Sequence, residues 1–186
     1  MRYTPTAIAL HWLTALLVLV ALPLGLSMTG LTLSPTKLRL YSYHKWLGVT
    51  VLALTAIRLW WRHRHPPPAL PAHVPAWQKE AAATLHRALY AFLFLIPLSG
   101  WLMSSAKGVQ TVYLGVLPLP DLLAKDETLG ALLAIIHASL CYVFAAILAG
   151  HVGAALKHHF FDRDDILRRM LPRGRALAQS STRENE

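Results

Sequence analysis

Acidic residues and cysteine are scarce in this chain of 186 residues. Nine Asp and Glu residues stand against eighteen Lys and Arg residues, and charged residues make up only 15% of the chain. The single cysteine, Cys141, excludes an intrachain disulfide. A hydrophobic share of 55% and a mean hydropathy of +0.42 are values of a membrane protein, and they argue against a soluble domain of this length.

Long uncharged runs predict where the chain crosses the membrane, because about 20 apolar helical residues span the hydrocarbon core of a bilayer. Three runs reach that length: Ala7 to Met28, Ala88 to Ala106 and Leu129 to Leu156. We expect a fourth helix over Tyr41 to Trp61, where Lys45 and Arg58 lie near the ends and can extend to the headgroups. The sequence therefore predicts an all-α integral membrane four-helix bundle.

The first run has a second interpretation as a secretory signal, since Arg2 precedes an apolar stretch that ends in small residues. Its length and the presence of His11 and Trp12 inside it favour a membrane helix.

The basic residues are divided unequally between the two sides of such a bundle. Four spans place both termini and the second connection on one side, and thirteen of the eighteen Lys and Arg residues fall there. The other side holds the remaining five: Lys37, Arg39, Lys45, Lys107 and Lys125. The positive-inside rule then predicts that both termini are cytoplasmic. The net charge of +9 reflects this topology and an affinity for anionic lipid, and we expect no nucleic-acid partner.

The connections between the spans are expected to be simple. Gly30 to Leu40 and Lys107 to Thr128 are predicted outer loops, and the proline-rich second connection is predicted to be extended and cytoplasmic. That connection holds three histidines expected to be solvated: His63, His65 and His73. After the last span we expect a short amphipathic basic segment at the membrane surface. One bundle accounts for residues 1–173, and residues 174–186 are predicted to be a disordered cytoplasmic tail.

Four histidines fall inside the predicted spans at depths that match in pairs. His137 and His151 are fourteen residues apart, which places them on nearly the same helix face and roughly 21 Å apart along the axis. His44 begins the second span at the outer depth of His137, and His11 begins the first span at the inner depth of His151. Facing imidazoles from two helices suit the two axial positions of a haem iron, so the pattern predicts two haems, one above the other.

Simpler interpretations of these residues exist. A single intramembrane histidine more often forms a hydrogen bond between helices, and Gly48 and Gly150, which could admit a macrocycle, more often serve helix packing. His86 also begins a span on the inner side and could replace His11 as the partner of His151. His158 and His159 lie at the inner boundary, where we favour an interfacial or quinone-contact role. Between the two levels, the facing positions of the last span are apolar: Cys141, Phe144 and Leu148.

Several segments resemble the bacterial cytochrome b561 family. They are ALHW at Ala9 to Trp12, YHKWLG at Tyr43 to Gly48, RLWWR at Arg58 to Arg62, IPLSGWLM at Ile96 to Met103, and the terminal HHFFDRDDILRRMLP. The resemblance covers about Arg2 to Arg173. It implies a multi-pass cytochrome of the bacterial inner membrane with two b-type haems, ligated by His44 with His137 and by His11 with His151. It also implies electron exchange with ubiquinone, and in one branch of the family the oxidation of superoxide at the outer face.

The expected function is a relay of single electrons between an outer donor and a quinone, with oxidoreductase activity left open. The outer cations would attract an anionic donor such as superoxide. Candidate quinone contacts are His86, His158 and Arg62, beside an aromatic rim of Trp60, Trp61 and Phe160 that could equally be an interfacial belt. Two alternatives remain open: a haem-bearing anchor subunit that connects a partner dehydrogenase to quinone, and a histidine-lined transporter of a metal or proton. The transporter is disfavoured because its ligands would cluster at one depth, often with carboxylates.

Overall fold

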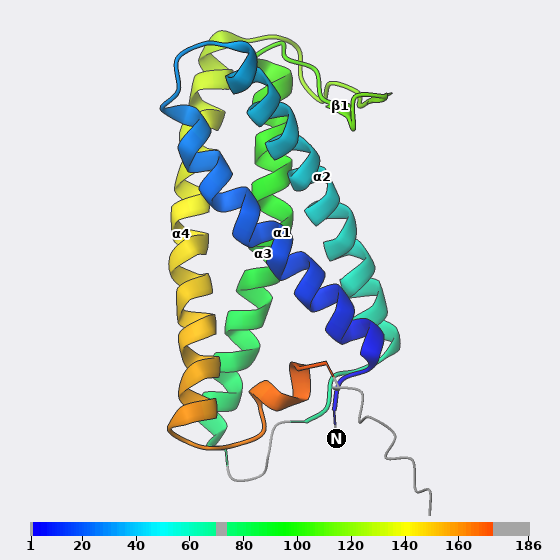
Figure 1. The fold of residues 1–186 in the computed structure, drawn as a ribbon, viewed down its shortest axis with the longest axis vertical. Coiled ribbons are helices and arrows are strands. Elements are labelled where there is room, and N and C mark those ends of the chain that lie inside the picture. The colour runs from blue at the N-terminus through cyan, green and yellow to red at the C-terminus, as the bar shows by residue number, and fades with distance from the viewer. Residues whose placement is uncertain (1, 70–73, 173–186) are drawn as a thin grey trace, which may run out of the picture.

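Four long helices form the structure, a computed structural model that describes residues 2–69 and 74–172. Their bounds are α1 Pro5–Thr29, α2 Pro35–Arg64, α3 Ala76–Ala106 and α4 Glu127–Phe160. A hairpin of two short strands, β1 Val112–Tyr113 and β2 Leu117–Pro118, lies between α3 and α4, and a 3-10 turn, η1 Leu167–Met170, follows α4. The predicted all-α four-helix bundle is confirmed (Figure 1).

Local sequence signals set the beginning of three of the helices. Thr4, Ser34 and Asp126 each accept a hydrogen bond from the backbone N–H three residues later, which satisfies one of the free donors of the first turn. Proline follows Thr4 and Ser34 as the first helical residue, where its missing N–H costs nothing. These N-terminal caps determine where α1, α2 and α4 begin.

The helices are longer than the predicted spans. α2 begins at Pro35, so most of the expected loop from Gly30 to Leu40 is helical. α3 begins at Ala76, twelve residues before the uncharged run at Ala88, because Lys79 and its polar neighbours are compatible with a helix outside hydrocarbon. The uncharged runs therefore locate the apolar portions of the helices but not the helix ends.

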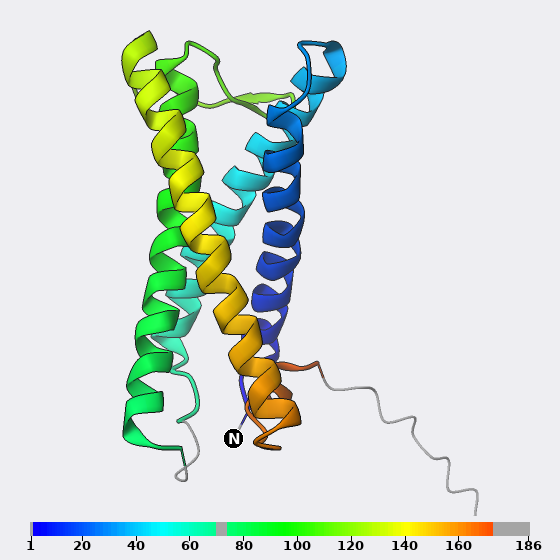
Figure 2. The same ribbon diagram turned by 90° about the vertical axis from the view of Figure 1, so that its left-hand side faces the viewer.

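Three of the described helices are long and apolar enough to cross a membrane: α1, α3 and α4. α2 does not reach that hydropathy because Lys45 and Arg58 divide its apolar part. It nevertheless packs along α1 and α3 within the bundle, and α3 packs along α4, as the two side views show (Figures 1 and 2). The membrane span predicted for α2 therefore depends on its place in the bundle rather than on its composition.

The centre of the bundle is apolar. Val18, Val51, Leu89, Leu93 and Phe144 form one buried cluster, contributed by all four helices. Phe144, which was predicted to face the space between the two histidine levels, is 3% exposed, and its ring stacks on Phe92 with 6.1 Å between ring centres. The predicted apolar wall between the two levels is confirmed at this residue.

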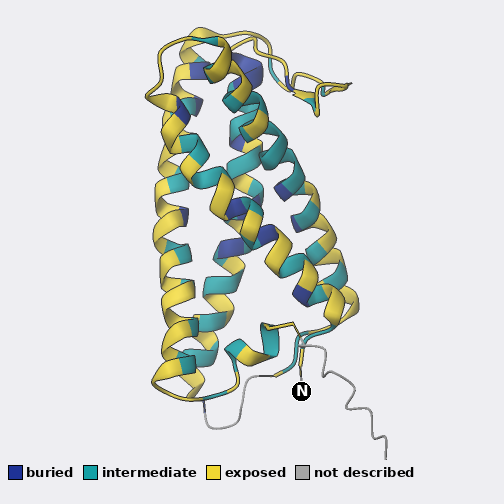
Figure 3. Ribbon diagram, in the orientation of Figure 1, coloured by how far each residue is buried: buried dark blue, intermediate teal, exposed yellow. Residues whose placement is uncertain are grey.

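The outward faces of the helices are also apolar. Large side chains such as Leu16, Leu19, Ile135 and Tyr142 are each about 60% exposed or more, and exposed residues cover most of the outer surface (Figure 3). A soluble monomer rarely exposes so much contiguous apolar surface. These faces are suited to contact with lipid.

The N-terminus and the segment after α4 are joined at one end of the bundle. Arg2 donates to the carbonyl groups of Arg168 and Leu171, and Trp12 Nε1 donates to the carbonyl of Met170 at 2.7 Å. We call residues 167–171 the terminal latch. The end of the bundle that holds it is called the terminal side, and the opposite end, which holds β1 and β2, the hairpin side. The tail predicted for residues 174–186 lies outside the described residues.

Candidate functional site

Four helical histidines meet in two pairs across the bundle. On the hairpin side, the ring centres of His44 on α2 and His137 on α4 are 6.2 Å apart, and the ring planes are inclined at 89°. On the terminal side, the ring centres of His11 on α1 and His151 on α4 are 6.3 Å apart, at 68°. We call them the hairpin-side pair and the terminal-side pair. They are the two pairs that the matching depths predicted.

The separations fit a metal held between two rings. An imidazole nitrogen binds a metal at about 2.0 Å and lies about 1.1 Å from its ring centre, so two rings on opposite sides of one iron have centres about 6.2 Å apart. Both pairs match this value. His86 is only 5.4 Å from His151 by the same measure, which is too short for an iron in between. His11 is therefore better placed than His86 as the partner of His151.

The hydrogen bonds of His137 prepare it as a ligand. Its Nδ1 lies 3.1 Å from the Ile96 carbonyl and 3.0 Å from Ser99 Oγ. A carbonyl can only accept, so Nδ1 carries the ring proton and donates it, which leaves the lone pair of Nε2 free for a metal. Cys141 Sγ, 3.8 Å away, is a weak neighbour of that nitrogen. The hairpin-side pair thus has the oriented imidazole expected at a haem iron.

His11 has a different neighbour. Arg58 Nη2 lies 3.1 Å from His11 Nδ1, and because a guanidinium only donates, Nδ1 accepts here. A neutral His11 then carries its proton on Nε2, so a metal at Nε2 would require that this proton leave or that Arg58 swing away. We expected Arg58 to extend to the headgroups, and this prediction was wrong. Its guanidinium turns inward, 5.2 Å from the ring centre of Tyr90, because His11 and that ring offer it an acceptor and a π face.

Lys45, the other charge inside α2, also turns to the protein. Its Nζ donates to the Val109 carbonyl at 2.9 Å, because the loop after α3 lies beside α2 at this level. The extension of Lys45 to the headgroups stays a prediction, since the Val109 carbonyl lies just beyond the end of α3.

Two glycines make room for the hairpin-side pair. A Cβ added to Gly25 would lie 2.9 Å from His44 Cε1, and one added to Gly100 would lie 3.0 Å from His137 Cε1. The backbones of α1 and α3 therefore approach the imidazoles as closely as glycine permits. A Cβ at Gly48 or Gly150 would meet nothing within 4 Å, so these two glycines border open space rather than a tight helix contact.

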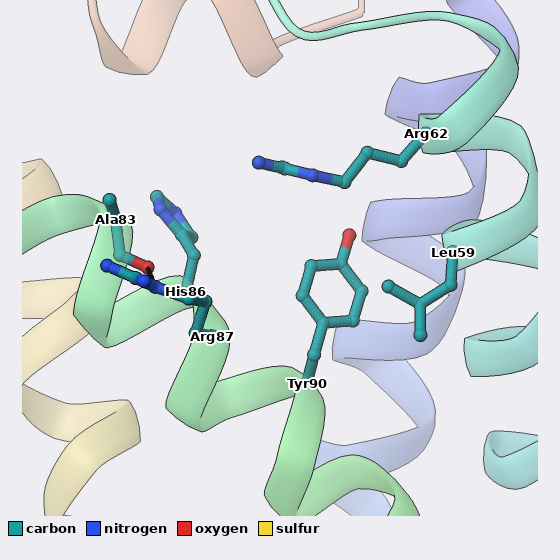
Figure 4. A pocket seen from close by; sticks show the side chains of 6 residues that line it. All are labelled: Leu59, Arg62, Ala83, His86, Arg87 and Tyr90. Carbon is teal, nitrogen blue, oxygen red and sulfur yellow. Dashed lines mark hydrogen bonds between the residues drawn. The ribbon is translucent and has the colours of Figure 1, made fainter.

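The three predicted quinone contacts are not in one place. His86 and Arg62 line a cavity of about 330 Å³ between α2 and α3, together with Leu59, Ala83, Arg87 and Tyr90. Arg62 extends across the cavity above Tyr90, and His86 borders it from α3 (Figure 4). Tyr90 was not among the predicted residues, although its place one turn after His86 could have suggested it.

His158 lies outside that cavity. It lines a second cavity of about 190 Å³ that includes Val74, Pro75 and Gln78 at the beginning of α3. Its Nδ1 lies 2.7 Å from a carboxylate oxygen of Asp164 and 3.1 Å from one of Asp162. A hydrogen bond from Lys157 holds the pKa of Asp162 below its usual range. His158 is thus a member of an ionic cluster at the end of α4.

Comparison with known proteins identifies the family of this chain. The family model described as prokaryotic cytochrome b561 matches residues 2–173. The chain belongs to the prokaryotic cytochrome b561 family. Among its relatives, cytochrome b561 homolog 2 of Escherichia coli strain K12 is 36% identical over 172 residues, 91% of each chain. Cytochrome b561 homolog 1 of the same organism is 34% identical over 176 residues, 92% of this chain and 98% of the relative.

A more distant relative has a more specific name. The probable superoxide oxidase CybB of Yersinia pestis is 26% identical over 175 residues, covering 94% of this chain and 98% of that protein. Cytochrome b561 proteins are haem-containing electron-transfer proteins of the membrane, and this chain is a multi-pass member in the bacterial inner membrane. The resemblance found in its sequence segments is confirmed.

Proposed function

We propose that this cytochrome b561 carries two b-type haems, one at each histidine pair, and passes single electrons between the two membrane faces. The observation that carries the proposal is the 6.2 and 6.3 Å separation of the paired imidazoles. His137 and His151 are roughly 21 Å apart along α4. In a hydrocarbon core about 30 Å thick, one pair would therefore lie in each half of the membrane. His44 with His137 and His11 with His151 would hold these haems, which would supply one-electron transfer.

The chain's own residues hold and orient these ligands. The Ile96 carbonyl and Ser99 fix the ring of His137, and Gly25 and Gly100 leave space for the rings of the hairpin-side pair. The buried cluster around Phe144 excludes water between the two levels. Arg58 places a positive charge beside His11, which would favour the reduced state of an iron bound there.

We propose superoxide as the donor at the hairpin side, which the predicted topology places outside the cytoplasm. The supporting observations are five Lys and Arg residues on that side and the likeness to the probable superoxide oxidase of Yersinia pestis. Two superoxide anions would each give one electron and leave as dioxygen, while one ubiquinone takes two electrons and two protons to become the quinol.

We propose the cavity between α2 and α3 as the quinone site. Arg62 and Tyr90 offer N–H and O–H donors for a quinone carbonyl, and the ring of His86 offers a further N–H. The ring centres of His86 and His151 are 5.4 Å apart, so the cavity adjoins the terminal-side pair.

This arrangement also suits an anchor subunit that delivers electrons from a partner dehydrogenase to quinone. Co-purification of such a partner in equal amount would favour that function.

The decisive experiment is a visible spectrum with haem stoichiometry on the purified protein. We expect two b-type haems per chain, with His137→Ala and His151→Ala each removing a different one, and His86→Ala keeping both. Loss of both haems equally in either variant, or of neither, contradicts the assignment of the pairs. A colourless protein with bound zinc would support the metal transporter instead.

Donor and acceptor are tested separately. We expect a superoxide-generating system to reduce the haems of the purified protein rapidly, and a ubiquinone analogue to reoxidise them. Arg62→Ala should raise the quinone concentration needed for half-maximal reoxidation about tenfold. A hydrogen bond from a charged group contributes about 1.5 kcal/mol to the binding free energy. His158→Ala is the matched control from the other cavity, and an equal effect there would place the quinone elsewhere.

A further inference from the structure

The hairpin formed by β1 and β2 exposes an apolar tip. No charged residue occurs between Lys107 and Asp121, and β1 pairs with β2 with Tyr113 opposite Leu117. Three large side chains at the tip are mostly exposed: Leu114 at 56%, Val116 at 80% and Leu117 at 54%. We call Leu114, Val116 and Leu117 the apolar tip. Such a cluster is unfavourable in water.

The turn at the tip holds one of these apolar residues at a conformational cost. Leu114 has φ +52° and Gly115 has φ +75°, and the Val116 N–H donates to the Tyr113 carbonyl at 3.1 Å. Positive φ is adopted most readily by Gly, Asn and Asp. A leucine in the left-handed region is uncommon. The chain thus presents a large apolar side chain where a small polar one would be less strained.

Hydrogen bonds from neighbouring helices hold the hairpin and the residues beside it. Three carbonyl groups accept them: Val109 from Lys45 Nζ (2.9 Å), Val112 from Trp46 Nε1 (2.7 Å) and Pro120 from Trp101 Nε1 (3.1 Å). The Leu119 N–H donates to the Thr111 carbonyl at 2.8 Å, and Pro118 and Pro120 have no N–H. Internal pairing of this kind is what non-helical backbone needs where water is scarce.

The hairpin lies at the depth of a membrane boundary. α2 has 30 residues and is about 45 Å long, so it exceeds a hydrocarbon core of about 30 Å. Its uncharged run begins at Trp46, directly after Lys45, and Trp46 donates a hydrogen bond to β1 of the hairpin. Tryptophan is enriched at the boundary between headgroups and hydrocarbon. The hairpin projects sideways from the bundle at this level rather than along its long axis (Figure 1).

We propose that the apolar tip inserts into the boundary between headgroups and acyl chains of the leaflet on the hairpin side. Lipid is favoured as the occupant because the hairpin projects sideways from the bundle and has no charge for a polar partner to recognise. The hairpin then fixes the outer part of α2, whose composition alone suits a membrane poorly, at a defined depth.

The test is a depth measurement in liposomes of bacterial phospholipid. Val116→Cys is made in a Cys141→Ala background, labelled with a nitroxide and examined by electron paramagnetic resonance with dioxygen and a water-soluble nickel chelate as collision partners. Dioxygen concentrates in lipid and the chelate in water. We expect Val116 to collide with dioxygen several-fold more often than with the chelate. Leu33→Cys, in the loop between α1 and α2, is the matched control, since Leu33 is 82% exposed, and it should show the opposite preference.

A second position protects the test against a variant that fails to fold. Leu117→Cys should give the same preference as Val116→Cys, and the haem spectrum of each labelled protein verifies that it is folded. Preferential collision with the chelate at either tip position in a protein of normal spectrum overturns the proposal. Low access to both reagents would also overturn it, because it would indicate that protein covers the tip, either a second copy of this chain or another partner.

Discussion

Gly25 and Gly100 are the residues whose replacement tests the hairpin-side pair most directly. Gly25→Ala and Gly100→Ala put a methyl group 2.9 and 3.0 Å from a histidine ring carbon, and overpacking of this kind costs about 1 to 3 kcal/mol. We expect each change to lower the occupancy of one haem about tenfold and to leave the haem of the terminal-side pair in place. Quantitative spectra of the purified variants measure this loss.

Gly153→Ala is the control for both changes, since a Cβ there meets nothing within 4 Å and alanine is the better helix former. It should keep both haems. Full occupancy in Gly25→Ala and Gly100→Ala would mean that the imidazoles do not hold this position in the loaded protein.

The position of Arg58 beside His11 predicts that the two haems differ in redox potential. A guanidinium beside His11 favours the reduced iron, so Arg58→Gln should lower the midpoint potential of the haem at the terminal-side pair. The amide oxygen of glutamine can accept a hydrogen bond from Nδ1 when Nε2 binds iron, so the change removes mainly the charge. Removal of a unit charge at this distance should change the midpoint potential by on the order of 50 to 100 mV. A redox titration followed by visible absorption measures both haems at once.

Arg64→Gln is the control, because Arg64 is exposed and lies over the Trp60 ring of its own helix. It should leave both potentials unchanged. An unaltered potential in Arg58→Gln would indicate that Arg58 leaves His11 when the haem binds.

The pairing of the four histidines could be predicted from the sequence, whereas the surroundings of His11 could not. The fourteen-residue spacing of His137 and His151 is a property of one helix, and the depths of His44 and His11 follow from the order of the spans. Whether Arg58 points to lipid or to His11 depends on how α2 is rotated against α1 and α3. The sequence of α2 gives no clear sign of that rotation, because polar and apolar residues are spread around the helix.

At the scale of elements, the terminal latch connects the segment after α4 to α1. Trp12→Phe removes the hydrogen bond to the Met170 carbonyl but keeps an aromatic ring, at a cost of about 1 kcal/mol. Opening of the latch should become about fivefold more frequent, and trypsin should cleave after Arg168 and Arg169 faster by the same factor. Digestion of the detergent-solubilised protein, followed by mass spectrometry, measures the rate.

Trp60→Phe serves as the comparison, because Trp60 is an exposed tryptophan of α2 that contacts Trp61 and Arg64. Its cleavage rate should equal that of the unmodified protein. Equal rates in Trp12→Phe would show that this hydrogen bond does not limit opening of the latch.

The elements differ in how well the sequence predicted them. Uncharged runs located the apolar parts of α1, α3 and α4, because burial in lipid requires such runs. The hairpin was expected to be a plain loop, since two residues per strand are too few for an alternating pattern to appear. The early beginning of α3 was missed for a related reason: a helix that continues into water keeps its hydrogen bonds without keeping its apolar composition.

The whole molecule has a predicted orientation, with both termini and the terminal latch in the cytoplasm. The excess of Lys and Arg on the terminal side is the physical basis, because positive loops remain on the cytoplasmic side during insertion. Leu33 and Phe161 lie at opposite ends of the bundle and are each 82% exposed, so they make a matched pair of probes. In a Cys141→Ala background, Leu33→Cys should react with a membrane-impermeant maleimide in spheroplasts. Phe161→Cys should react only after the membrane is permeabilised, and the reverse pattern would invert the proposed direction of electron flow along with the topology.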